Sequence, residues 1–342
     1  MIFKEMNDNQ RRVYIDTAQI YEAYIGTFYK SQAYRGGMHW KKSKGRQYLF
    51  RSRDRYGYGE SLGLRSPETE KILVEFRENK LQQKERLKNL NDRLDEQARF
   101  CKAALIQRVP RVVIGILRQL DQQKLLGKNV LVCGTNALYA YEAAAGVFFD
   151  NPIMATNDLD ILWDIRPKLT LVGDNDIERI GLLDILRKAD RSFEPVEPRS
   201  FRAVNRNGYM VDLIKPEPKQ LLKKERTQMG DSNDLKAAEI RNLHWLIASP
   251  KMSQVVIGDD GHPAAMTVPD PRSFALHKLW LSEQPDRESV KKQRDCDQGI
   301  AVSHLIVNYL PQYKFNASEL RMFPKTVFSE AKKHLSDQGQ NC

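Results

Sequence analysis

The chain has 342 residues, with 55 Lys and Arg against 44 Asp and Glu, so its net charge is +11, and 41% of its residues are hydrophobic. This composition excludes a collagen or a wholly disordered chain, the longest apolar runs are too short to span a membrane, and the first residues lack a signal peptide's apolar core. Four widely spaced cysteines argue against a disulfide scaffold or a zinc cluster, and they predict free thiols in a cytoplasmic protein.

The excess positive charge lies in the first third of the chain. Residues 1–120 contain 25 basic and 14 acidic side chains (25 − 14 = +11), whereas residues 121–342 contain 30 of each. Within residues 35–65, basic side chains are interleaved with aromatic ones such as Trp40, Tyr48 and Phe50. Such a segment can neutralise phosphates and stack on bases, which favours RNA as a partner. A solvated loop or a small β-ribbon whose aromatic side chains pack on the protein explains the pattern equally well.

The first third is expected to be mostly helical. Residues 10–32 have apolar side chains at loose helical spacing, and Ser66-Pro67-Glu68 is a favourable start for a second, long helix. The long helix carries Leu87, Leu90, Leu94 and Cys101 on a narrow apolar stripe, which calls for one partner helix. Residues 111–123 are the candidate partner.

The remaining elements predict an α+β fold, with a small mixed β-sheet flanked by helices. Strands are expected at residues 129–133, 159–165 and 209–214, with a helix at 136–145 after the first of them. The segment after Pro218 is expected to be helical and polar. The C-terminal helices are expected at residues 272–284, 286–310 and 317–336.

Two strands carry the residues that predict chemistry. Asp158 and Asp160 lie two positions apart on one strand, so both carboxylates share a face. Like charges this close repel unless a cation lies between them, and carboxylates on a rigid strand suit Mg²⁺ or Mn²⁺. Asp212, between Val211 and Leu213, is expected to join them from a neighbouring strand and to complete a catalytic and metal-binding set. Asp164 is interpreted as a surface residue at the end of its strand.

The turn after the first of these strands is the candidate nucleotide-binding segment. Gly134 lets the backbone approach a ligand, Thr135 offers a hydroxyl, and Asn136 lies where the next helix begins and presents free N–H groups to a phosphate. Arg202 is interpreted mainly as part of a solvated face, with a triphosphate or acceptor contact as the alternative.

These motifs together resemble the DNA polymerase β-type nucleotidyltransferase superfamily. The resemblance rests on Leu131-Val132-Cys133-Gly134-Thr135, Asp158-Leu159-Asp160 and Val211-Asp212-Leu213, and it covers roughly residues 125–310. It extends to bacterial nucleotidyltransferase-like proteins related to the toxins of type IV toxin–antitoxin and abortive-infection systems. The resemblance implies that Lys278 binds nucleotide and that Asp295, on the next helix, is a further candidate. Thr135 stands in place of the usual Ser, and the spacing from Gly134 to Asp158 is longer than many members have.

The resemblance implies a metal-dependent transfer of a nucleoside monophosphate from a nucleoside triphosphate to a hydroxyl, with release of pyrophosphate. RNA, such as a tRNA 3′ end, is the favoured acceptor, and protein or small-molecule hydroxyls are alternatives. A non-catalytic RNA- or partner-binding protein on the same scaffold and a glycosyltransferase are the competing hypotheses. An antitoxin protein is a further expected partner. The expected organisation is a basic, mostly helical region at 1–125, a catalytic core at 126–220 and a mostly helical domain at 221–342.

Overall fold

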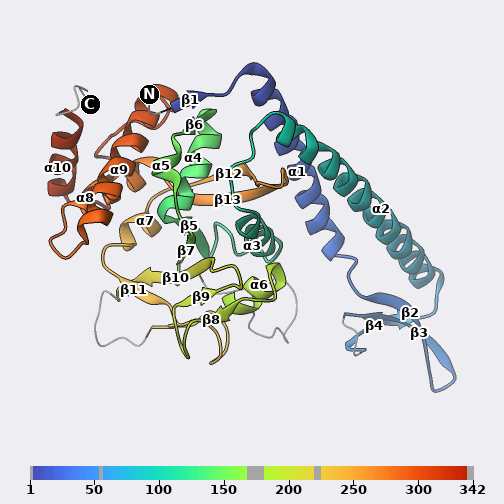
Figure 1. Cartoon of the computed structure of the whole chain (residues 1–342). Helices are drawn as coiled ribbons and strands as arrows, with labels where there is room; N and C mark the ends of the chain where they lie inside the picture. The colour runs from blue at the N-terminus through green and yellow to red at the C-terminus, as the bar shows by residue number, and fades with distance from the viewer. Residues whose placement is uncertain (1–2, 54–56, 168–180, 219–224, 337–342) are drawn as a thin grey trace.

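The computed structural model describes residues 3–53, 57–167, 181–218 and 225–336. The fold is α+β, as expected: Figure 1 shows a long helical arm with a small sheet at its tip, a central sheet covered by helices, and a group of C-terminal helices. Within those described ranges, no helix is both long and apolar enough to cross a membrane.

The arm is a pair of antiparallel helices, α1 (Asp8–Gln32) and α2 (Pro67–Ala103). Capping boxes begin both: the Asn7 side chain accepts from the Gln10 N–H, and the Ser66 side chain accepts from the Thr69 N–H. The two helices contact each other, and the buried residues of α2 lie toward its two ends, at 69–76 and 94–101. Residues 111–123 were the expected partner of α2, and this prediction is wrong because a narrow apolar stripe fits any helix with a matching face. The buried cluster at the base of the arm includes Val13, Tyr21, Leu94, Cys101 and Ile106.

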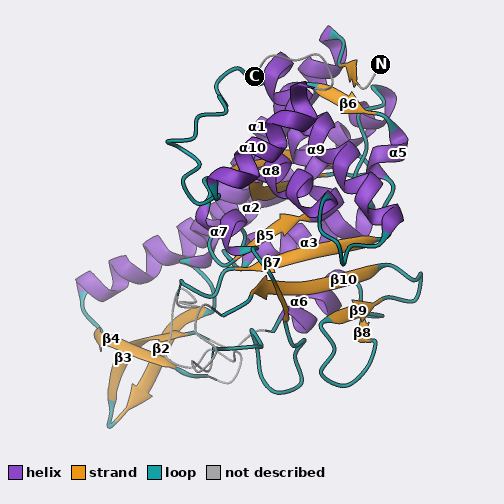
Figure 2. Cartoon of the chain, turned by 90° about the vertical axis from the view of Figure 1, so that its left-hand side faces the viewer, coloured by secondary structure: helices purple, strands orange, loops and turns teal. Residues whose placement is uncertain are grey.

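The tip of the arm is an antiparallel three-stranded sheet of β2 (Gly37–Ser43), β3 (Arg46–Ser52) and β4 (Gly59–Leu64). Figure 2 shows it at the far end of α2 from the helices around the central sheet. The basic, aromatic segment is therefore a small β-sheet rather than a solvated loop.

The central sheet is mixed, with the strand order β5-β7-β10-β9-β8 and β11 also paired with β10. Strand β10 is parallel to β7 and β11 and antiparallel to β9, while β5 is antiparallel to β7. The strands are β5 (Val130–Cys133), β7 (Asp158–Trp163), β8 (Glu194–Pro195), β9 (Arg202–Val204), β10 (Met210–Pro216) and β11 (Ala238–Ile240). In β7 the alternation of acidic and apolar side chains buries Leu159 and Ile161 fully and leaves Asp158 and Asp160 less covered.

Helices α3 (Arg111–Gln122), α4 (Ala137–Ala145) and α6 (Leu182–Ala189) share the main hydrophobic core with this sheet and with an antiparallel hairpin. The hairpin strands are β12 (Lys251–Ile257) and β13 (Pro263–Pro269). A polar helix was expected after Pro218, and across residues 225–270 this is wrong, because that range contains the hairpin, β11 and only a short helix, α7 (His244–Ala248). The division of the chain into regions 1–125, 126–220 and 221–342 stays a proposal. Helix α3, from the first region, and the β12–β13 hairpin, from the third, pack in the same hydrophobic core as the middle region.

The C-terminal helices are α8 (Pro271–Ser282), α9 (Ser289–Tyr309) and α10 (Lys325–Ser336). Asp270 caps α8 by accepting from the Arg272 N–H, and Pro271 fits the first turn. Leu276 and Leu279 of α8 pack in a separate cluster with Trp245 and Phe323. The remaining short elements are β1 (Phe3–Glu5), which pairs with β6 (Val147–Phe149), the 3₁₀ turn η1 (Gly134–Asn136) and α5 (Asn151–Met154).

Candidate active site

The register of two parallel strands brings the three predicted aspartates together. In the pairing of β7 with β10, Asp160 lies opposite Asp212, and Asp158 lies opposite Met210. Because alternate residues of a strand point to one face, Asp158 and Asp160 share the face on which Asp212 stands. The structure thus places side by side three carboxylates that are separated by up to 54 positions in the sequence (212 − 158).

Charge repulsion within this group is visible at Asp160. Burial, followed by the negative charges of Asp158 and Asp212, raises the pKa of the Asp160 carboxyl to about 7, although Lys278 and Arg202 act in the opposite direction. A buried carboxyl with like-charged neighbours favours its neutral form unless a cation compensates. Near neutral pH the Asp160 carboxyl therefore either keeps its proton or has a positive ion in place of that proton.

Arg202 holds the third aspartate. It lies on β9 directly opposite Asp212. Its Nε donates to Asp212 Oδ1 at 2.7 Å and its Nη2 donates to Asp212 Oδ2 at 2.6 Å, so the pair is bidentate. The interpretation of Arg202 as mainly a solvated face is wrong, because this pairing fixes the orientation of a carboxylate in the site.

The glycine turn packs directly on the aspartates. Gly134 follows β5 with φ of +62°, a conformation that favours glycine, and a Cβ added there would overlap Asp160 Oδ2. Thr135 and Asn136 are buried and bonded within the protein. Thr135 Oγ1 accepts from Gln298 Nε2 of α9 at 3.1 Å, and Asn136 Nδ2 donates to the backbone oxygen of Asp158 at 2.6 Å. These two side chains thus tie the turn to α9 and β7.

Lys278 and Asp295 form a buried ion pair between α8 and α9. Lys278 Nζ lies 2.6 Å from Asp295 Oδ1, and Arg287 Nε donates to Asp295 Oδ2 at 2.8 Å. Asp295 is fully buried and Lys278 almost so. The positive charge of Lys278 opposes the rise in the pKa of Asp160, so Lys278 acts on the aspartate group. Asp295 holds Lys278 in place.

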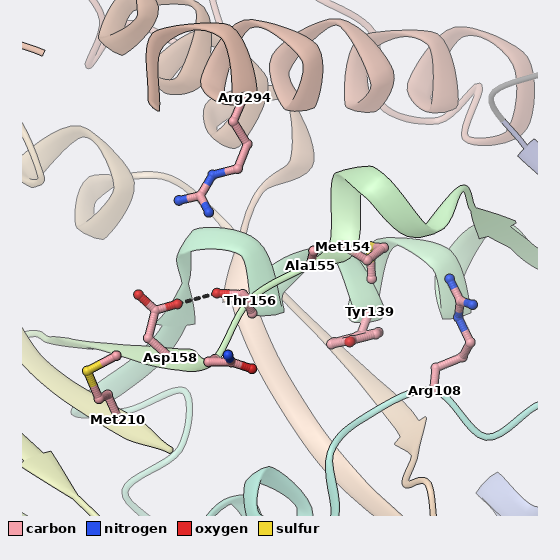
Figure 3. A pocket seen from close by; sticks show the side chains of 9 residues that line it. Arg108, Tyr139, Met154, Ala155, Thr156, Asp158, Met210 and Arg294 are labelled. Carbon is pink, nitrogen blue, oxygen red and sulfur yellow. Dashed lines mark hydrogen bonds between the residues drawn. The ribbon is translucent and has the colours of Figure 1, made fainter. Parts of the chain in front are cut away.

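A cavity of about 690 Å³ opens beside Asp158 (Figure 3). The start of β7 and the residues before it line the cavity, together with Tyr139 of α4, Met210 of β10, Arg108 from the segment before α3 and Arg294 of α9. Figure 3 shows Arg294 extending from α9 toward Asp158 and Thr156, whose hydroxyl donates to the Asp158 carboxylate. The volume is that of a small-ligand site.

Arg294 is one of the lining residues that the sequence analysis overlooked, with Arg108 and Tyr139. It directly precedes Asp295, and adjacent residues on a helix point in directions about 100° apart. Asp295 therefore faces α8 while Arg294 reaches the cavity. The run Lys291-Lys292-Gln293-Arg294-Asp295 was the available signal, but it did not show which cation faces the site.

The donor chemistry of the aspartates fits a divalent cation. Carboxylate oxygens are the preferred ligands of Mg²⁺ and Mn²⁺, and a cation would relieve the repulsion that raises the pKa of Asp160. Over the part of the chain that the structure describes, no three acidic, His or Cys side chains already form an ion-holding group. Asp158 and Asp160 are the fitting pair, while the Asp212 carboxylate is engaged by Arg202.

A Gly134→Ala substitution is expected to lower the activity of this site about 100-fold and to destabilise the fold by about 1–3 kcal/mol. The Cβ would displace the Asp160 carboxylate, and a misplacement of about 1 Å at a reacting group has an effect of that size. Gly208→Ala is the matched control, because Gly208 also has a positive φ, +78°, but open space around it. Initial rates and thermal unfolding check the prediction, and equal activity losses in both variants would contradict it.

Comparison with known proteins identifies the class of the protein. A family profile described as "Nucleotidyltransferase" matches residues 111–323, well over half of the chain, so the chain belongs to this nucleotidyltransferase family and is a transferase enzyme. The match contains every candidate site residue from Gly134 to Asp295 and leaves the helical arm outside. The predicted nucleotidyltransferase resemblance is confirmed. No curated protein and no solved structure matches the chain.

Proposed function

We propose that the protein transfers a nucleoside monophosphate from a nucleoside triphosphate to a hydroxyl acceptor, with release of pyrophosphate and with Mg²⁺ or Mn²⁺ as cofactor. The observation that carries this proposal is the register that sets Asp212 opposite Asp160, next to a glycine turn whose backbone contacts Asp160. Family membership supports nucleotidyl transfer in general.

Each aspartate has a distinct role in this proposal. Asp158 and Asp160 hold the cation from one face of β7, and Asp212 accepts the proton of the acceptor hydroxyl. The acceptor oxygen then forms a bond to the α-phosphorus while the bond from that phosphorus to the pyrophosphate oxygen breaks, and the pyrophosphate leaves. The bound cation supplies charge neutralisation for the triphosphate. Arg202 supports the transfer by orienting Asp212.

The triphosphate is expected to lie between the glycine turn and α9. Backbone N–H groups after Gly134 lie at the start of α4, where the helix dipole favours anions. The Thr135 hydroxyl and the Asn136 amide already bond within the protein, so their contribution is to shape the turn. Lys278 and Arg294 supply positive charge from the facing helices.

RNA is the acceptor that the charge distribution favours. The arm carries the excess of basic residues, and its tip contains the aromatic and basic segment 35–65. A tRNA 3′ end, protein hydroxyls and small-molecule hydroxyls are the acceptors to compare. The relationship to toxins of toxin–antitoxin systems, an antitoxin partner and a cytoplasmic location stay predictions.

The test is a transfer assay with the purified full chain. The protein is incubated with each α-³²P-labelled nucleoside triphosphate, Mg²⁺ or Mn²⁺, and separate pools of total RNA, protein and metabolites. Label in the RNA pool with equimolar pyrophosphate is the expected result. Label in the protein or metabolite pool would identify a protein or a small molecule, instead of RNA, as the acceptor. The absence of both label and pyrophosphate under all conditions would refute the proposed function.

A further inference from the structure

The sheet at the tip of the arm has one packed face and one open face. In the packed face, Met38 and Leu49 are buried against Leu73 and Phe76 of α2, with Trp40 at the edge of this cluster. This packing explains half of the aromatic and apolar residues of the segment. It leaves unexplained the side chains that point the other way.

The open face carries aromatic and basic side chains side by side. Tyr48 and Phe50 lie on β3, the central strand, with Lys41 directly opposite Tyr48 and His39 directly opposite Phe50 on β2. The Lys41 Nζ lies 4.9 Å from the centre of the Phe50 ring, and the rings of His39 and Phe50 are 5.8 Å apart. His39 and Lys41 are exposed, and the two β3 aromatic residues are half-buried. The open face, defined by these four residues, thus carries aromatic rings tilted against each other, with the Lys41 ammonium over the Phe50 ring.

More positive charge lies at one end of the open face. Lys44 lies in the turn between β2 and β3, and Arg46, the first residue of β3, lies on the same face as Tyr48 and Phe50; both are exposed, whereas Lys42 shares the face of Met38 and Trp40. Two other arginines of the segment are engaged within the arm: Arg51 bonds the Ala33 carbonyl and Arg65 pairs with Glu70. The turn therefore presents a concentrated positive charge to an anionic partner.

We propose that the open face binds a single-stranded segment of nucleic acid, with bases stacked on Tyr48 and Phe50 and phosphates held by Lys41 and the β2–β3 turn. Half-buried rings on a central strand offer a stacking surface only to bases that are already unstacked, so single strands are favoured over duplexes. The charge excludes a cationic partner. The bound strand's role as acceptor rests on the proposed function, whereas its binding needs neither triphosphate nor transfer.

The test measures binding of the full chain to a fluorescein-labelled 20-nucleotide single-stranded RNA by anisotropy, without triphosphate. Tyr48→Ala and Phe50→Ala are each expected to weaken binding about tenfold or more, because stacking on a ring has an effect of this order. Tyr48→Phe keeps the ring and is expected to bind as the wild type does. Phe100→Ala is the matched control, since Phe100 is exposed on α2 away from the tip.

Charge and fold are checked separately. Lys41→Gln is expected to reduce the slope of log affinity against log salt by about one, whereas Lys84→Gln, on the exposed side of α2, leaves it unchanged. A Phe50→Trp variant reports stacking by fluorescence quenching when RNA is added, which keeps the test informative if an alanine variant fails to fold. Absence of quenching overturns the proposal.

Further outcomes separate this proposal from the other candidates. Equal affinity of the alanine variants and the wild type overturns it, as does preference for a duplex of the same sequence. A dimer that dissociates in the alanine variants would assign the open face to a second copy of the chain. Asp160→Asn is expected to bind RNA normally, so a failure of transfer and a failure of binding remain distinguishable.

Discussion

An Asp160→Asn variant is expected to lose nucleotidyl transfer by at least about a hundredfold while it stays folded. The substitution keeps the shape of the side chain but removes one of the two charges on β7 that fit the cation, and loss of one electrostatic contact to the transition state has an effect of this size. Pyrophosphate release and transfer of α-label measure the effect. Asp184→Asn, on the exposed side of α6, is the control and is expected to keep full activity.

The same variant is expected to be more stable than the wild type above pH 7 without Mg²⁺. The pKa of Asp160 is raised to about 7, so between about pH 4 and pH 7 the folded state binds a proton that the unfolded state has released. Stability from this proton is present at low pH and is lost as the pH rises through 7. Asparagine has no such proton to lose.

The measurement compares thermal unfolding of the two proteins from pH 5 to pH 8.5. The difference in unfolding free energy is expected to grow by roughly 2 kcal/mol in favour of the variant, and contributions from titrating groups that do not interact with Asp160 cancel between the proteins. Mg²⁺ is expected to stabilise the wild type at pH 8 and to have little effect on the variant. Equal stabilisation of both proteins by Mg²⁺ would remove Asp160 from the cation site.

Local signals predicted the elements that local chemistry determines. Ser66 and Pro67 marked the start of α2, and the alternation around Asp160 marked a strand with an acidic face. The partner of α2 was not predictable, because one apolar stripe does not specify which helix covers it. The β12–β13 hairpin was missed because Lys251–Ile257 and Pro263–Pro269 are short segments of mixed apolar and polar residues, whose periodicity does not separate strand from helix.

The site shows the same division between local and long-range information. The acidic set was predictable from its motif, whereas the pairing of Arg202 with Asp212 depends on the register of β9 on β10. Asp164 was expected at the surface, and this is wrong: it is 1% exposed and accepts two side-chain hydrogen bonds from Arg166, at 2.9 and 2.8 Å. A bidentate partner makes burial of a carboxylate tolerable, and the residue type alone does not reveal the partner.

An Asp295→Asn variant is expected to destabilise the protein by about 3–5 kcal/mol. Asp295 is fully buried and neutralises both Lys278, at 2.6 Å, and Arg287, at 2.7 Å. Asparagine leaves the buried ammonium of Lys278 without a compensating charge, and removal of one partner from a buried ion pair has an effect of this size. Thermal and denaturant unfolding measure the loss. Asp297→Asn, an exposed position two residues along α9, is the control and is expected to change stability by less than about 0.5 kcal/mol.

A double variant separates the structural role of the pair from the binding role of Lys278. Lys278→Met with Asp295→Leu replaces the buried Lys278–Asp295 pair with apolar side chains but leaves Arg287 without Asp295, so part of the lost stability is expected to return. Transfer activity is not expected to return, because the positive charge that acts on Asp160 is then missing. The discriminating measurement is the KM for the triphosphate at a temperature where every variant is folded. A double variant with wild-type KM and rate would show that Lys278 only holds α8 against α9. An Asp295→Asn protein as stable as the wild type would contradict the buried ion pair itself.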